Sequence, residues 1–120
     1  MSDRLGEIFT LREEFMNKIN EKIPGAYPSW PIDLKVKSNQ QAVREFAFRG
    51  MEELFEALLH LKNWKNHRVG AEEFDRAEFL EEMIDAYKYF TAILILTGVD
   101  SEEFFDAYKK KHDIICSRLD

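Results

Sequence analysis

Two pairs of acidic residues have the spacing that lets two side chains share one face of a helix. Glu53 and Glu56 are three residues apart, and so are Glu82 and Asp85. Positions i and i+3 of a helix lie on the same side, so each pair can present both carboxylates in one direction. Four carboxylates in one place repel one another and require cations. Hard oxygen ligands select Mg²⁺, with Mn²⁺ as a substitute.

A divalent-metal site of this kind is suited to phosphate chemistry. Such ions bridge phosphate oxygens and lower the pKa of water, which prepares it for attack on phosphorus. The same acidic pairs also fit solvated helix faces, where Glu and Asp usually lie. The metal interpretation is favoured because both predicted helices are apolar on their other faces.

A basic and aromatic segment, Leu61–Arg68, follows the first acidic pair. Its cations could screen a triphosphate, and Trp64 and Lys62 could cover a base or sugar. A basic helix end favoured by the helix dipole is the competing interpretation. Lys88 lies one turn beyond Asp85, where it could contact phosphate or simply neutralise the acids.

Four helices must position these residues, and hydrophobic periodicity predicts them over residues 4–23, 38–67, 76–97 and 100–118. Ser38 with Gln41 is a capping-box signature at the start of the second helix. Gly98 is expected to cap the third helix, and Asp100 with Glu103 marks the start of the fourth. The prolines fall in a loop over residues 24–37, and the break over residues 69–75 contains Gly70.

This organisation predicts one all-α domain over residues 1–120, with a four-helix bundle-like architecture. The short break makes the second and third helices antiparallel neighbours, which can bring the acidic pairs face to face. The second helix carries apolar residues on two sides, so it should be buried on two sides and meet a second subunit. The two sets are Phe46, Met51, Leu54, Leu58 and Leu61, and Phe48, Phe55 and Leu59.

Composition limits the partners and the setting. The formal net charge of −6 disfavours a nucleic acid or an anionic membrane as the main partner. The one cysteine, Cys116, can form no disulfide within the chain, which fits a reducing cytoplasm. No signal peptide is visible, and the longest apolar run, Tyr89–Leu96, is too short to span a bilayer.

The motifs Glu53-x-x-Glu56 and Glu82-x-x-Asp85 resemble those of the all-α nucleoside triphosphate pyrophosphohydrolase superfamily. That group includes MazG-like enzymes, dimeric dUTPases, phage dCTP/dUTP pyrophosphatases and phosphoribosyl-ATP pyrophosphatase. The resemblance runs from about residue 40 to residue 118. Leu61–Lys65 is similar to the Lys/Trp segment of the phage and dimeric dUTPase branch, and residues 102–111 with Arg118 are similar to its last helix.

The resemblance implies Mg²⁺-dependent hydrolysis to a nucleoside monophosphate and pyrophosphate, with all four paired acids as metal ligands. It implies that Glu56 also orients or deprotonates the attacking water, supported by Glu52. It assigns phosphate contacts to Lys65, Tyr108, Lys111 and Arg118. Asn17 is the residue retained from the pyrimidine-reading motif of the first helix. The family resemblance also implies a homodimer or homotetramer.

Some positions depart from the dUTPase branch: Ile115 and Ala92 stand where that branch has Asn. Metal and phosphate chemistry therefore carry over better than uracil recognition. We expect dUTP or dCTP slightly ahead of dGTP, with broad use open. The compact chain is similar to phage-encoded members, which act in the host cytoplasm. Two alternatives are a nucleotide–metal binding module without turnover and a structural helical interaction domain.

Overall fold

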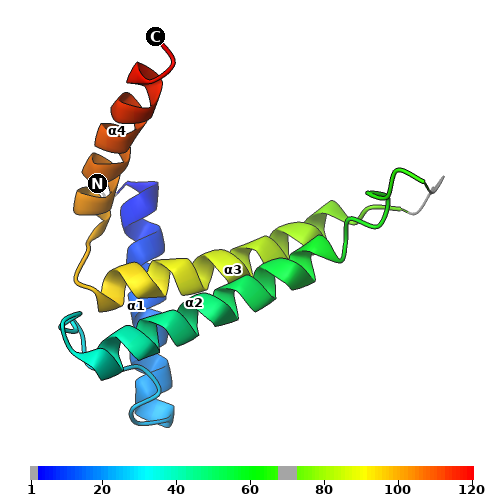
Figure 1. The fold of residues 1–120 in the computed structure, drawn as a ribbon. Coiled ribbons are helices and arrows are strands. Elements are labelled where there is room, and N and C mark those ends of the chain that lie inside the picture. Colours follow the sequence, from blue (N-terminus) through cyan, green and yellow to red (C-terminus); the bar gives the residue numbers. More distant parts are fainter. Residues whose placement is uncertain (1–2, 68–72) are drawn as a thin grey trace. The chain divides into compact units, whose positions relative to one another are not determined.

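The computed structural model describes residues 3–67 and 73–120, and over these residues it contains four α-helices and no strand. The helices are α1 (Arg4–Lys22), α2 (Lys37–Leu58), α3 (Arg76–Leu96) and α4 (Ser101–Ser117) (Figure 1). The all-α prediction is confirmed. The predicted break falls largely on residues 68–72, including Gly70, which lie outside the described residues. The chain forms two compact units, one from the segments up to Asp33 and from Leu94 to Asp120, the other from Leu34 to Ile93.

In the first unit, side chains of α1 form hydrogen bonds with the loop that follows this helix. Asn20 accepts a hydrogen bond from the Tyr27 backbone N–H at 2.8 Å and donates one to the Tyr27 carbonyl at 3.2 Å. Arg12 donates to the Tyr27 hydroxyl at 3.0 Å, and both side chains are buried. The Ile32 N–H donates to the Leu96 carbonyl at 2.8 Å. These bonds give the proline-containing loop a defined course even though it has no regular structure.

The turn from α3 into α4 follows the predicted chemistry. Gly98 has φ +83°, the left-handed conformation in which a side chain would be strained, and it ends α3. The Asp100 side chain accepts a hydrogen bond from the Glu103 N–H at 2.8 Å and so caps α4. Phe104 then packs near Phe9 of α1, with ring centroids 6.2 Å apart. Both helix-end predictions are confirmed.

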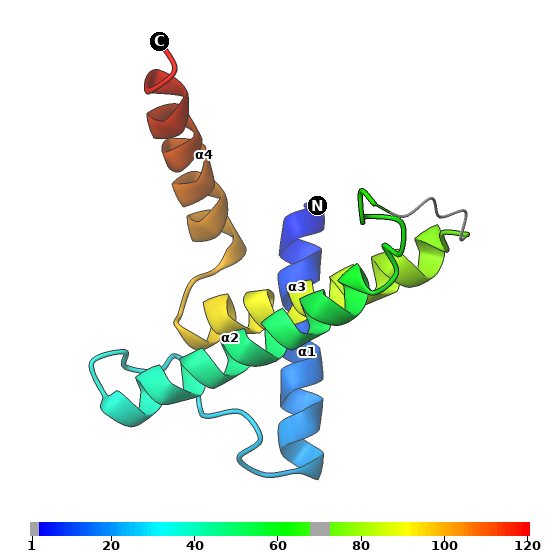
Figure 2. The same ribbon diagram turned by 45° about the vertical axis from the view of Figure 1, so that its right-hand side comes forward.

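The second unit is built from α2 and the Arg76–Ile93 part of α3, which run antiparallel and side by side in both views (Figures 1 and 2). They approach closely at Gly50, where an added Cβ would lie 3.1 Å from the Tyr89 Cβ. A glycine at a helix contact lets the two backbones come together without a clash. The predicted antiparallel pairing is confirmed.

Two predictions for α2 are wrong. The helix ends at Leu58, not near residue 67, and the 3₁₀-type bonds from His60 to Ala57 and from Leu61 to Leu58 tighten the chain beyond it. The apolar spacing continues as far as Leu61, but the Asn-containing segment that follows is a poor helix former. At the other end, Val36 is the N-cap and makes no side-chain cap bond, so Ser38 lies inside the helix and does not cap it.

The apolar faces of α2 are largely open in the single chain. Only Phe46 and Ala57 of this helix are buried, while Phe55 is 64% exposed and Phe48 is 53% exposed. On α3, Leu80, Ile84 and Phe90 are exposed as well. Large apolar side chains are therefore exposed along both helices of the pair. Over the described residues, no helix combines the length and apolar character needed to cross a membrane.

Candidate metal centre

The antiparallel pairing of α2 and α3 brings three of the four predicted metal ligands together. Carboxylate oxygens of Glu53, Glu82 and Asp85 lie within 4.8 Å of one another, and all three residues are half-buried. Glu53 comes from α2 and the other two come from successive turns of α3. Helical i, i+3 spacing aligns the α3 pair, and the close approach of the helices sets Glu53 opposite.

The grouping changes the protonation behaviour of Glu53. Partial burial raises the pKa of its carboxyl above the ordinary value of 4.5, and the charge of Glu56 raises it further. A hydrogen bond shared with Glu56 and the charges of Asp85 and Glu82 act in the same direction. The carboxylates around Glu53 raise its pKa because they repel its negative charge. A cation bound among them would be favoured for the same reason.

The fourth predicted ligand, Glu56, lies beside this group but is not part of the three-residue set. It is exposed on α2, and it interacts with Glu53 by charge and by hydrogen bonding. This position leaves its carboxylate accessible from solvent. Glu52 is also exposed on α2, and its supporting role stays a prediction.

One cation of α3 borders the acids. The Lys88 ammonium lies 3.9 Å from the Asp85 Oδ1, an i, i+3 contact between half-exposed side chains. Such a pair contributes little to stability because water and salt screen it. It does place a positive charge at the edge of the candidate centre, as the sequence predicts, where it can neutralise an acid or meet an anion.

A pocket of about 280 Å³ adjoins the end of α2. Lys62 and Trp64, the predicted base- or sugar-binding residues, both line it, and Trp64 is 70% exposed. The Lys65 ammonium lies 5.5 Å from the centre of the Trp64 ring, in a cation–π arrangement. These residues lie beyond the helix, so they belong to an irregular segment and not to the face of α2. The other lining residues are His60, Leu61, Asn63, Glu73 and Phe74.

The remaining predicted site residues belong to the first unit. Asn17 is exposed on α1, Tyr108 and Lys111 are exposed on α4, and Arg118 is the C-cap of α4. Their use at the metal centre stays a prediction. Within α4 no residue is buried, which leaves its basic face accessible.

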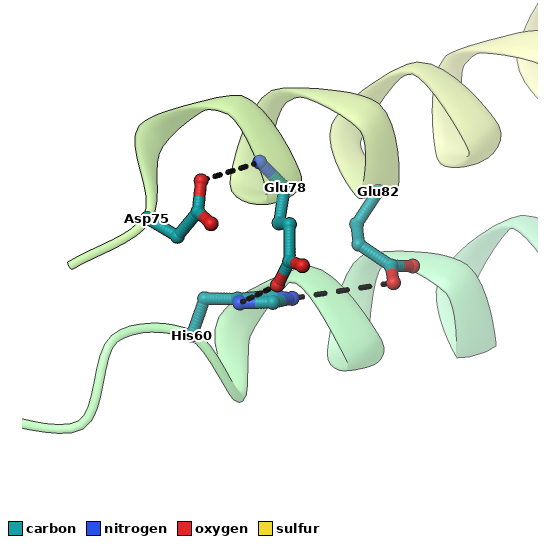
Figure 3. A network of polar contacts seen from close by, with 4 residues as sticks. All are labelled: His60, Asp75, Glu78 and Glu82. Atoms are coloured by element: carbon teal, nitrogen blue, oxygen red, sulfur yellow. Dashed lines mark hydrogen bonds and ion pairs between the residues drawn. The ribbon is translucent and has the colours of Figure 1, made fainter.

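Sequence reasoning did not select His60, which the structure places between two carboxylates of α3 (Figure 3). Its Nδ1 lies 3.9 Å from Glu78 Oε2, and its Nε2 lies 4.0 Å from Glu82 Oε1. A signal was available. His60 is seven residues after Glu53, and Glu78 is seven residues before Asp85. Antiparallel helices that set Glu53 opposite Asp85 therefore also set His60 opposite Glu78.

The donor set fits a hard divalent cation. Mg²⁺ binds carboxylate oxygens at about 2.0–2.1 Å, so oxygens on one ion lie up to about 4 Å apart, and small side-chain rotations bring the three carboxylates into that range. Comparisons with family models, with curated proteins and with solved structures found no match.

Proposed function

We propose that this chain hydrolyses a nucleoside triphosphate to a nucleoside monophosphate and pyrophosphate with Mg²⁺. The observation that carries the proposal is the convergence of Glu53, Glu82 and Asp85 from two helices to within 4.8 Å. The resemblance of the two acidic motifs to the all-α pyrophosphohydrolases supplies the reaction. The same resemblance supports a MazG-like fold for the four helices.

Different residues of the chain bind the metal and activate the water. Glu53, Glu82 and Asp85 hold the metal, which neutralises phosphate charge and lowers the pKa of water when bound. Glu56, exposed beside Glu53, orients the attacking water and accepts its proton, with Glu52 as its support. Mn²⁺ would serve in place of Mg²⁺ because it accepts the same oxygen ligands.

Substrate binding draws on cations and one exposed ring. Lys88 at the edge of the centre would contact phosphate, and Trp64 and Lys62 would cover the base or sugar from their pocket. The resemblance adds phosphate contacts from Lys65, Tyr108, Lys111 and Arg118, and a base contact from Asn17. We place dUTP and dCTP slightly ahead of dGTP as substrates.

We also propose that the working form is a homodimer or homotetramer. The large apolar residues exposed on α2 and α3 support this, because a second copy would remove them from water at about 25 cal/mol per Å². Light scattering should give a mass of two or four times 14.2 kDa. Phe55→Glu, which places a charge on this surface, should lower that mass.

A screen of the common dNTPs and NTPs for pyrophosphate release, with Mg²⁺ and with Mn²⁺, tests the function. At least one substrate should release pyrophosphate only when metal is present. Glu56→Gln should reduce turnover by about 10²- to 10⁴-fold, the usual contribution of a general base. Glu81→Gln is the matched control, because Glu81 is an exposed neighbour of Glu82 with no role in the proposal. Full activity in Glu56→Gln would remove the assigned role of Glu56.

Calorimetry separates the alternatives. Metal-dependent nucleotide binding without pyrophosphate release would identify a binding module and overturn the hydrolase proposal. No metal-dependent binding of any nucleotide would leave a structural helical domain, with the acids as solvated groups.

A further inference from the structure

His60 is held between two acidic side chains at one end of the α2–α3 pair (Figure 3). It follows the last turn of α2, and its side chain is 24% exposed. The two ring nitrogens face different carboxylates of α3: Nδ1 faces Glu78 at 3.9 Å and Nε2 faces Glu82 at 4.0 Å. The imidazole is therefore directed toward the candidate metal centre through one nitrogen and away from it through the other.

The backbone of Glu78 is held at the start of α3. The Asp75 side chain accepts a hydrogen bond from the Glu78 N–H at 3.1 Å, which fixes the first turn of α3. A neutral imidazole that binds an ion through Nε2 carries its proton on Nδ1, which faces the Glu78 carboxylate at 3.9 Å. The lone pair then lies on Nε2, which is the common arrangement of a metal-binding histidine and its carboxylate partner.

The Glu82 side has the dimensions of a shared ligand position. Metal–nitrogen and metal–oxygen bonds of about 2.1 Å place two donors on one ion between about 3.0 Å apart when adjacent and about 4.2 Å when opposite. The Nε2–Oε1 separation of 4.0 Å lies within this range. Glu82 also belongs to the three-carboxylate group, so it can contact two ions, one on each side.

We propose that His60 Nε2 and the Glu82 carboxylate hold a second divalent ion, a transition metal, beside the one held by Glu53, Glu82 and Asp85, with Glu78 orienting the imidazole. The inference rests on the proposed metal centre. An imidazole nitrogen suits transition metals, whereas Mg²⁺ prefers oxygen and water. The second position therefore takes Mn²⁺ or Co²⁺ in preference to Mg²⁺, while the first accepts Mg²⁺.

Metal titrations of the full chain test this proposal without measuring turnover. Calorimetry should find Mn²⁺ binding at one more position than Mg²⁺. His60→Gln keeps a polar side chain of similar reach but removes the nitrogen ligand, so it should abolish or weaken the additional Mn²⁺ event by at least about tenfold while leaving Mg²⁺ binding unchanged. Glu78→Gln should weaken the same event by about 10- to 100-fold, as loss of a ligand's orienting partner does. His67→Gln is the control, since His67 is exposed in the same segment.

A second measurement uses the unmodified chain and so does not depend on a variant folding. In the Co²⁺ complex, proton NMR should show one strongly shifted, solvent-exchangeable imidazole N–H, arising from Nδ1 of His60. Equal Mn²⁺ and Mg²⁺ stoichiometry with no shifted imidazole proton would overturn the second position and leave the three-carboxylate centre intact. Absence of any Mg²⁺, Mn²⁺ or Co²⁺ binding would overturn that centre as well.

Discussion

The two units treat charged groups in opposite ways. In the first unit, Arg12 is 8% exposed and donates a hydrogen bond to the Tyr27 hydroxyl, so burial of its charge comes with a partner from the same unit. In the second, Glu53, Glu82 and Asp85 bring like charges together. The pKa of Glu53 is raised, mainly by burial of its carboxyl and further by the charges of the neighbouring carboxylates. A buried hydrogen bond within one unit contributes to its stability, whereas like charges held close together favour a bound cation.

The largest effect should come from removing a ligand in the second unit. Glu82→Gln takes one carboxylate from the three-residue group and the partner from His60, so Mg²⁺-dependent hydrolysis should fall by at least about 100-fold, since loss of an outer partner alone costs 10- to 100-fold. Thermal unfolding with and without Mg²⁺ should show that the metal no longer raises the Tm. A Tm that still rises as in the unmodified chain would contradict the assignment.

The matching change in the first unit should affect folding and not metal binding. Arg12→Met leaves the buried Tyr27 hydroxyl without this donor, which should lower the free energy of unfolding by about 1–3 kcal/mol. Urea denaturation measures this, with Arg4→Met, an exposed change on the same helix, as control. The rise in Tm caused by Mg²⁺ should persist in Arg12→Met. Loss of the Mg²⁺-induced rise in Tm would mean that metal binding in the second unit depends on Arg12 of the first.

A smaller effect is expected at the exposed ring of the pocket beside the centre. Trp64→Ala should raise KM for the preferred nucleotide about tenfold, because stacking of a base on an aromatic ring contributes about 1–3 kcal/mol. The kcat should change little, since Trp64 lies in the pocket and not among the carboxylates. Steady-state kinetics of Trp64→Phe, which keeps an aromatic face, should return most of the affinity. An unchanged KM in Trp64→Ala would exclude stacking.

The smallest effect concerns how the Glu53 carboxylate, next to other carboxylates, changes the stability of the metal-free chain. Because the folded pKa of Glu53 is raised, its contribution to stability without metal is fully present below the ordinary value of 4.5 and is lost as pH rises through the folded value. Glu53→Gln should remove this dependence and stabilise the metal-free chain at pH 7 by about 0.2–0.5 kcal/mol, the size of a like-charge pair on a helix. Denaturation at several pH values without Mg²⁺ measures it, and a destabilised variant would show that the carboxylate is satisfied within the chain.

The fold was predictable where local chemistry decides the structure. Gly98 and Asp100 act at helix ends as their residue types predict, and α1, α3 and α4 have nearly the expected bounds. The end of α2 was not predictable in this way. Leu61 continues the apolar spacing of the helix, but the chain has already turned at Leu59, which no single residue type marks.

The same division holds for the site. The i, i+3 spacing of Glu82 and Asp85 is a property of the sequence, so their shared face could be predicted. The pairing of His60 with Glu78 depends on the register between α2 and α3. That register can be predicted only when one contact between the two helices is already known. The apolar pattern of α2 predicts burial on two sides, yet most of these residues are exposed in the single chain. What covers them is not encoded in the spacing of one helix.

Gly50 connects helix packing to the geometry of the proposed metal centre. It lies one turn before Glu53, and a methyl group there would meet Tyr89 at 3.1 Å, so the helices would have to separate by a few tenths of an ångström. That distance is comparable to the difference between Mg²⁺–oxygen bonds of about 2.1 Å and Ca²⁺–oxygen bonds of about 2.3–2.6 Å. At the proposed metal centre, the absence of a side chain at Gly50 thus helps to set how closely the carboxylate of Glu53 approaches those on α3.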